Sequence, residues 1–257
     1  MAAQPEAAAG HVTLVPVLQA MRELYSQPPG TERFKEYLRM ATSMGDMALP
    51  ISRINPMAKA HALTYVEKMI ALDAENVAIG AAAAASAELP ADALQLSLIL
   101  LDDLKGGWTN RTFAEFEHRY ERKYEVQRGW AVVVLWTSEE PSREFVRERT
   151  REAMYRTIAE RDRGPVRTLR EIMKREGETM RFAGRTSSRY DAATLASIEV
   201  TIAPHLDSNA APVVIASLYG DEIAASLGYP PLGLPAHAAY EAALARELNG
   251  ARRTSWI

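Results

Sequence analysis

The feature that most constrains the fold is a pair of apolar runs separated by a polar stretch. Residues 94–101 read LQLSLILL, and residues 130–136 read WAVVVLW with three consecutive β-branched valines. The stretch between them, about residues 111–126, is polar and has the periodicity of a helix. A strand, a crossover helix and a second strand predict one parallel, right-handed βαβ unit, with strands at about 94–101 and 130–137.

Most of the remaining chain carries helical signals. Helices are expected at about residues 11–27, 31–42, 56–72 (with Asn55 as the N-cap), 73–89, 141–183 (broken at Gly164-Pro165), 191–203 and 236–248. Residues 212–219 fit either a strand or a helix, and the helix is favoured. The predicted fold class is therefore α+β and predominantly helical, with helices packed around a small sheet.

Length and composition set the expected domain organisation. The chain has 257 residues, of which 47% are hydrophobic, so it can bury a sizeable core. We predict a disordered lead over residues 1–10 and a single globular domain over residues 11–257. A sub-boundary near residue 140, where the charge content changes, is the alternative.

Composition also excludes several classes of function. The chain has no cysteine, which rules out disulfides, thiolate catalysis and cysteine-bound metals. The N-terminus lacks the basic start and apolar core of a secretory signal, and the longest apolar run, residues 77–87, is too short to cross a bilayer. A net charge of −3 gives no general attraction to nucleic acid or to membranes. We expect a cytoplasmic protein.

The best candidate site is the loop from Asp102 to Arg111. Asp102 and Asp103 directly follow the first predicted strand, at the edge where open α/β sheets place ligands. Either carboxylate could ligate Mg²⁺ or act as a general base, so both are assigned as catalytic. The loop matches neither a P-loop nor GxGxxG, so the sequence identifies no cofactor beyond that Mg²⁺.

The rest of the same loop offers binding groups. Its two glycines allow close approach of a ligand to the backbone, and Thr109 or Asn110 would cap a helix whose N-terminus favours an anion. The predicted ligand-binding residues are Lys105, Gly106, Gly107, Trp108, Asn110 and Arg111. We expect a small anionic ligand, with a phosphate-containing one favoured. The alternative is a glycine turn with a helix cap and two solvated aspartates.

Two residues upstream are second-rank members of the site. His61 is a candidate acid or base, and Asn55 is a candidate ligand-binding residue, because both could approach the Asp102 loop in space. The alternative for His61 is a residue at the boundary between core and water that bonds to a neighbour.

Three further motifs point more weakly to function. Glu115 and His118 form a single ExxH, and without a second such motif or HExxH no metal site is predicted. Residues 142–189 carry a net charge of about +6, but their charges interleave at helical spacing, which favours a solvated, paired helix face over nucleic-acid binding. Residues 182–190, with Arg185 and Arg189 around three hydroxyls, are typical of an anion-binding loop and equally of an ordinary connection.

Two classes of function remain open. The first is a protein, with or without catalytic activity, that binds a small anionic ligand at the Asp102–Arg111 loop. The second is a non-catalytic protein that interacts with other proteins or forms a structural homo-oligomer through its charged helices and its proline-rich segment, residues 228–235. A pocket at the loop would favour the first class, and an exposed apolar patch elsewhere would favour the second.

Overall fold

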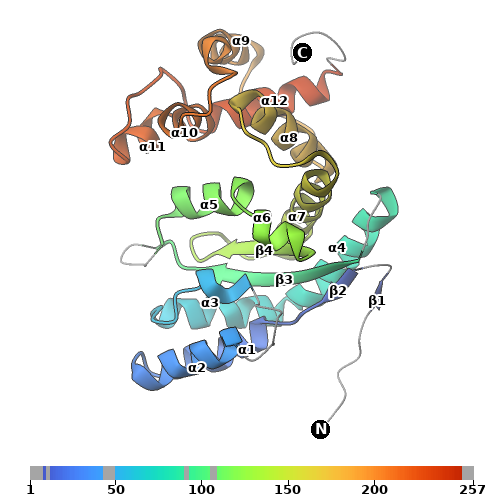
Figure 1. The fold of residues 1–257 in the computed structure, drawn as a ribbon, viewed down its shortest axis with the longest axis vertical. Coiled ribbons are helices and arrows are strands. Elements are labelled where there is room, and N and C mark those ends of the chain that lie inside the picture. The colour runs from blue at the N-terminus through green and yellow to red at the C-terminus, as the bar shows by residue number, and fades with distance from the viewer. Residues whose placement is uncertain (1–7, 10–11, 43–49, 90–92, 105–108, 251–257) are drawn as a thin grey trace. The chain divides into compact units, whose positions relative to one another are not determined.

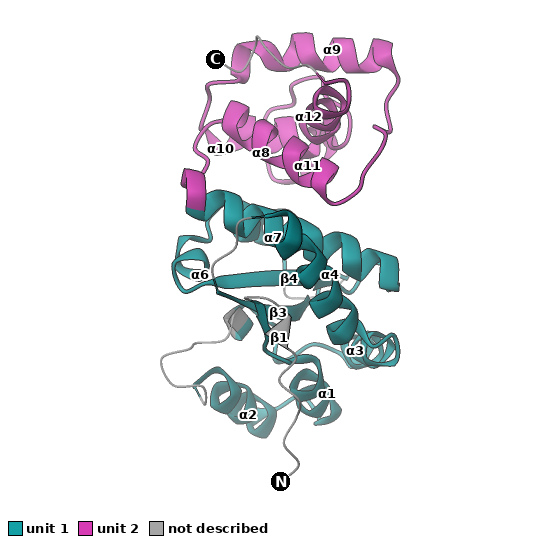
Figure 2. Ribbon diagram, turned by 90° about the vertical axis from the view of Figure 1, so that its right-hand side faces the viewer, with its two compact units in different colours: residues 1–161 teal, residues 162–257 magenta. Residues whose placement is uncertain are grey.

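The computed structural model describes residues 8–9, 12–42, 50–89, 93–104 and 109–250. The chain divides into two compact units, residues 1–161 and residues 162–257 (Figure 2). We expected one domain, with a boundary near residue 140 as the alternative. The division that the contacts show lies later, near the end of a long helix.

Unit 1 combines a small sheet with helices. Its elements are β1 (Ala8–Ala9), β2 (Val12–Leu14), α1 (Leu18–Ser26), α2 (Thr31–Thr42), η1 (Pro50–Arg53), α3 (Ala60–Ala71), α4 (Ala74–Glu88), β3 (Leu94–Leu101), α5 (Arg111–Tyr120), α6 (Lys123–Gln127), β4 (Trp130–Trp136) and nearly all of α7 (Arg143–Arg163). The helices α1 and α2 lie on one side of the sheet and α7 lies on the other (Figure 1).

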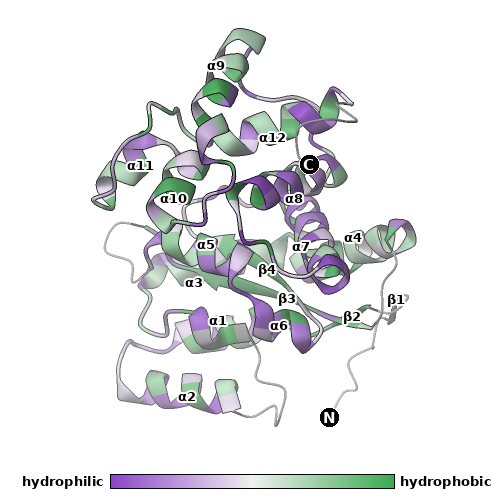
Figure 3. Ribbon diagram, turned by 45° about the horizontal axis from the view of Figure 1, so that its top comes forward, coloured by the Kyte–Doolittle hydropathy of each residue, from purple (hydrophilic) through white to green (hydrophobic). Residues whose placement is uncertain are grey.

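The sheet confirms the two predicted strands. Its order is β1-β2-β3-β4, with β2, β3 and β4 parallel and β1 antiparallel to β2. Every residue of β4 is buried, as are all but one of β3, and both strands are mainly hydrophobic in Figure 3. A parallel strand covered by helices on both faces needs such a continuous apolar run. The connection from β3 to β4 is helical, as expected, but it breaks at residues 121–122 into α5 and α6.

The prediction for the N-terminal segment was wrong in its first part. Residues 12–14 form β2 rather than the start of a helix, and Ala8 and Ala9, within the expected disordered lead, form β1. The rest of that lead lies outside the described residues. The β-branched residues before Pro16 suit a strand, and the proline disfavours helical backbone before it. The helix α1 then begins at Leu18, where the Glu75 carboxylate of α4 accepts hydrogen bonds from the N–H groups of Val17 and Leu18.

The predicted cap at Asn55 was also wrong. The side-chain Oδ1 of Asn55 accepts a hydrogen bond from the N–H of Met57 at 2.9 Å, and α3 starts only at Ala60. The Asn55 side chain therefore closes a local turn with the residue two positions ahead. Asparagine forms such turns as readily as it caps helices, so the residue type alone does not distinguish the two.

The regular elements in the described part of unit 2 are all helices. Unit 2 contains the end of α7 and the elements α8 (Leu169–Phe182), α9 (Ala192–Ile202), η2 (Ala203–His205), α10 (Ala211–Tyr219), α11 (Asp221–Ser226) and α12 (Ala238–Leu248). The segment 212–219 is thus helical, as favoured, and Asp191 caps α9 by accepting from the N–H of Thr194.

The helices α8 and α12 pack closely at Gly177. A Cβ atom on this residue would lie 2.7 Å from the backbone oxygen of Ala243, so only glycine fits without a shift of one helix. By contrast, a Cβ atom on Gly80 of α4 would meet nothing within 4 Å.

These two glycines give a matched test of the packing. We expect Gly177→Ala to lower the free energy of unfolding by about 1–3 kcal/mol through overpacking, although alanine is the better helix former. We expect Gly80→Ala to raise it by about 0.5–1 kcal/mol. Urea unfolding of both variants measures this, and stabilisation by Gly177→Ala would contradict the close contact between α8 and α12.

Candidate functional site

The parallel pairing of β3 and β4 brings the ends of both strands together. Leu101 is paired with Trp136, and the N–H of Thr137 still donates to the Leu101 carbonyl at 3.1 Å. The next residues, Asp102 and Asp103 after β3 and Thr137 and Ser138 after β4, therefore meet at one edge of the sheet. We call this group, together with His61 and Arg111, the edge cluster.

His61 and Asp102 form the closest contact of the edge cluster. The Nε2 atom of His61, on α3, lies 2.7 Å from Oδ1 of Asp102. The Asp102 side chain is 4% exposed, whereas the His61 side chain is 30% exposed. The expectation that His61 approaches the Asp102 loop is met by this contact, which joins a buried carboxylate to an imidazole that solvent can reach.

Asp103 is held by the protein on both of its oxygens. Its Oδ1 accepts from the N–H of Ser138 at 3.0 Å, and its Oδ2 accepts from the Ser138 hydroxyl at 2.6 Å and from Arg111 Nη1 at 3.2 Å. The hydroxyl of Thr137 lies 3.1 Å from both Asp103 Oδ1 and Asp102 Oδ1. These contacts join the ends of β3 and β4, so the Asp103 carboxylate has a clear structural role.

Arg111 is engaged by several acidic groups. Besides Asp103, its guanidinium contacts Glu139 at 2.6 Å and Glu115 at 3.6 Å, and it lies over the ring of Trp136. Since these carboxylates already neutralise its charge, Arg111 fits an anchor of the edge better than a free clamp for an anion.

The other predicted site residues fall into three groups. Asn110 caps α5, because its side chain accepts from the N–H of Phe113 at 3.2 Å. Asn55 is buried in its turn, and its carbonyl accepts from the Tyr25 hydroxyl. Lys105, Gly106, Gly107 and Trp108 lie outside the described residues.

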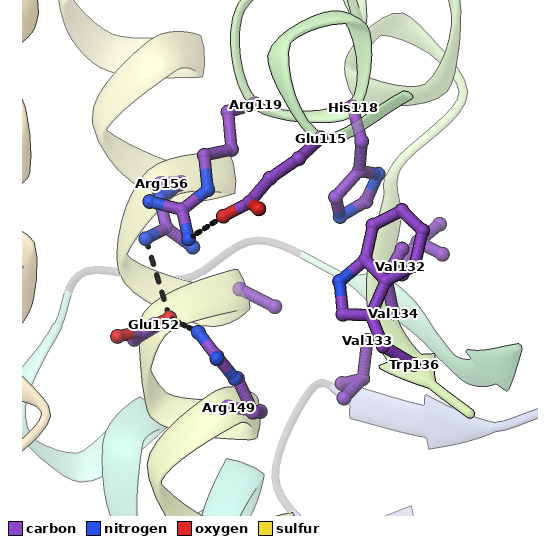
Figure 4. A pocket seen from close by; sticks show the side chains of 11 residues that line it. Glu115, His118, Arg119, Val132, Val133, Val134, Trp136, Arg149, Glu152 and Arg156 are labelled. Carbon is purple, nitrogen blue, oxygen red and sulfur yellow. Dashed lines mark hydrogen bonds and ion pairs between the residues drawn. The ribbon is translucent and has the colours of Figure 1, made fainter. Parts of the chain in front are cut away.

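A second layer of charge lies behind the edge, between α5, β4 and α7. The carboxylate of Glu139 accepts from Arg149 as well as from Arg111, and Arg149 also donates to Glu152 at 3.1 Å. Glu152 in turn accepts from Arg156 at 3.2 Å. Figure 4 shows Arg149, Glu152 and Arg156 beside a cavity of about 30 Å³, which has room for one or two water molecules.

Burial and neighbouring charges shift the pKa values of this inner network. Burial alone would raise the pKa of Glu152, but the guanidinium groups of Arg156 and Arg149 lower it to about 2. Burial and the charges of Arg122 and Arg53 hold the pKa of His118 well below its usual range. His118 is therefore neutral, and its Nδ1 has no hydrogen-bond partner among the described residues.

A larger pocket lies at the same end of β3. It has a volume of about 270 Å³ and is lined by Leu101, the first turns of α5 and Arg53 of η1. Its lining residue Thr109 donates its N–H to the Asp102 carbonyl at 3.3 Å. This pocket is thus adjacent in the chain to the Asp102 end of the edge cluster, and it is large enough for a small ligand.

Two weaker sequence candidates have internal partners. Arg185, Ser188 and Arg189 all donate to Glu241, whose side chain is buried on α12, so the loop at residues 182–190 is held within unit 2. The described residues include no group of three or more acidic or histidine side chains that could hold a metal ion.

The charged face expected on α7 is solvated only in part. Glu144 and Arg147 form an exposed pair, as predicted, but Glu152, Arg156 and Glu160 are buried. Charge spacing along a helix is the same whether the partners meet in water or inside the protein, so periodicity alone misplaced these residues.

Sequence reasoning missed the polar residues at the end of β4. Thr137, Ser138 and Glu139 follow the second strand just as Asp102 and Asp103 follow the first, and parallel strands end at one edge. The polar residues that directly follow the second predicted strand could therefore have been identified from the sequence. Tyr65 was also missed: it lies one helical turn after His61, and its buried hydroxyl has no partner among the described residues.

The geometry is not explained by any known relative. No protein-family model, curated protein or solved structure matches this chain. In the described part of the chain, no single helix is long and apolar enough to span a membrane. The helices α3 and α4 reach that length and apolar character only when taken together, and the chain bends by 58° between them.

The buried, neutral His118 makes stability depend on pH. In the unfolded chain a histidine binds a proton below about pH 6.5, whereas folded His118 does not. The unfolded state then binds more protons, so stability falls as pH drops below that value, by at most about 1.4 kcal/mol per pH unit.

We expect His118→Gln to flatten this decline between about pH 8 and about pH 5.5. Denaturant unfolding of the native chain and the variant across that range is the measurement. The range stays above the pH at which Glu152 takes up a proton, since its stabilising effect is lost only as pH falls from its ordinary value toward about 2. Equal slopes for both proteins would show that His118 is not held neutral.

Proposed function

We propose that unit 1 binds a small molecule at the edge where β3 and β4 end, and that His61 and Asp102 act on it as an acid–base pair. The observation that carries the proposal is the 2.7 Å contact between a buried carboxylate and a partly exposed imidazole. Such a pair has the parts that general acid–base catalysis needs, and Leu101, the chain neighbour of Asp102, lines the pocket of about 270 Å³.

The chemistry follows from the ionisable groups. When Asp102 accepts the proton of His61 Nε2, the neutral imidazole carries its lone pair on Nδ1. That nitrogen can take a proton from a ligand or a water molecule, and the Asp102 carboxylate then stabilises the imidazolium. Asp103 and Arg111 would keep the strand ends in place during this step, as their contacts with Ser138 and Glu139 indicate.

The pocket supports a small ligand with an anionic group. Two features of its lining bear on an anion: the guanidinium of Arg53, which also pairs with Glu125 at 3.4 Å, and the N-terminus of α5, which Asn110 caps. A phosphate or carboxylate group would meet both. One acidic residue, Glu117, also lines the pocket. The second expectation, Mg²⁺ at Asp102 and Asp103, has weaker support, because the oxygens of Asp103 already accept hydrogen bonds from protein groups.

One observation favours the competing class, a protein that interacts with other proteins. Phe34 and Leu38 of α2 are 43% and 45% exposed, four residues apart on one helix face. Two exposed side chains form a small patch compared with the areas that stable interfaces bury. The pocket and the acid–base pair therefore remain the better-supported basis for function.

A thermal-shift screen tests the proposal. The probes are inorganic phosphate, magnesium chloride, AMP and citrate, each on the native chain, His61→Gln, Asp102→Asn and the control Glu67→Gln, an exposed residue of α3. A probe at about one hundred times its dissociation constant should stabilise the native chain by about 2.7 kcal/mol.

We expect the control to respond like the native chain, and the two site variants to lose most of the shift. A probe that stabilises all four proteins equally binds elsewhere and counts against the site. The same holds if none of the probes shifts the native chain, because the proposed anionic ligand class would then be unsupported.

A further inference from the structure

A second pocket lies wholly within unit 2, at the corner between α7 and α8. Its volume is about 170 Å³, and its walls come from Arg163, Gly164 and the first two turns of α8 with Glu171, Lys174 and Arg175. None of these residues takes part in the edge cluster. The pocket therefore needs an explanation of its own.

The walls of this pocket are positively charged. Three of its side chains, Arg163, Lys174 and Arg175, are cationic, and only Glu171 is acidic. The surrounding chain has the same bias, because residues 163–175 hold five cations and one carboxylate. A cavity in whose lining cations outnumber carboxylates favours anions.

The carboxylate of Glu171 accepts hydrogen bonds from the backbone at the start of α8. Its Oε2 accepts the N–H groups of Arg167 and Thr168 at 2.6 and 3.2 Å, which completes the capping box of α8. The oxygen of Glu171 that accepts hydrogen bonds is thus used by the backbone. Glu171 and Glu178, which pairs with Arg163, supply two carboxylates against the three cations of the pocket.

The cations differ in how they are held. Arg175 is 8% exposed and donates to the Gly164 carbonyl at 3.2 Å, which fixes its guanidinium at the base of the corner. Arg163 pairs with Glu178 at 2.8 Å. Lys174 is exposed, and its amine has no hydrogen-bond or ion-pair partner among the residues that the structure describes. A fixed guanidinium beside an unengaged amine is a combination that suits a compact anion.

From this arrangement we infer that the corner pocket of unit 2 binds a phosphate group, either inorganic phosphate or the phosphate of a small phosphomonoester. Lys174 supplies the mobile positive charge, Arg175 supplies the positioned guanidinium, and Arg163 adds to the field. The site is separate from the edge cluster and stands or falls independently of the acid–base pair.

The test is a titration of the full chain with inorganic phosphate at low ionic strength, followed by calorimetry and by the backbone amide signals of Gly164 and Lys174. We compare the native chain with Lys174→Gln and with the control Lys68→Gln, an exposed lysine of α3. Because Lys174 is exposed, its replacement should leave the fold intact. A parallel titration with glycerol phosphate distinguishes free phosphate from a phosphomonoester.

We expect saturable binding that shifts both amide signals, weakens as salt is added, and becomes about tenfold weaker in Lys174→Gln while the control stays unchanged. Binding of either phosphate compound in this pattern supports the inference. Absence of saturable binding by both compounds, undiminished binding in Lys174→Gln, or an equal loss in Lys68→Gln would overturn it.

Discussion

The structure of unit 1 depends on how charge is buried between α5 and α7. Arg122, Glu152 and Arg156 are buried, and an isolated charge in such a place is strongly unfavourable. Each therefore has a partner: Arg122 donates to Glu160 and Thr157, and Glu152 accepts from Arg149 and Arg156. The pairs of Glu152 with Arg149 and Arg156 lie within α7. Arg122, by contrast, reaches α7 from the connection between α5 and α6, and Glu139, after β4, accepts from Arg149 of α7. The contacts of Arg122 and Glu139 form only when these elements are correctly packed, so they make the packing specific even where they add little to net stability.

The same network determines the shape of the candidate site. Glu139 is the shared member, since it accepts from Arg149 of the interior and from Arg111 of the edge cluster. Arg111 then reaches Asp103, which ties Ser138 to the end of β3. The position of the strand ends, and with it the setting of Asp102 and His61, is thus coupled to charges deep between the helices. These contacts hold the strand ends in place, and His61 is the member of the His61–Asp102 pair that solvent reaches.

Sequence reasoning was accurate where a signal is local. The apolar runs of β3 and β4 and the break at Gly164-Pro165 depend on a few neighbouring residues, and each was predicted. The cap of α5 was narrowed to Thr109 or Asn110, and it is Asn110. Sequence reasoning failed where contacts with residues far away in the sequence determine which element forms and where it begins. The strand β2 forms because β3 offers it an edge, and α1 starts where Glu75 of α4 meets its N-terminus. The contact between His61 and Asp102 joins residues 41 positions apart, so the sequence suggested the two groups but could not show that they touch.

The hydroxyl of Thr137 gives the edge cluster one more property. It lies 3.1 Å from an oxygen of each aspartate, yet a hydroxyl has a single proton and can donate to only one of them at a time. The carboxylate that does not receive this hydrogen bond has one donor fewer. A single O–H bond at the end of β4 therefore links two carboxylates that are adjacent in the chain but hold different partners: His61 in the case of Asp102, and Ser138 and Arg111 in the case of Asp103.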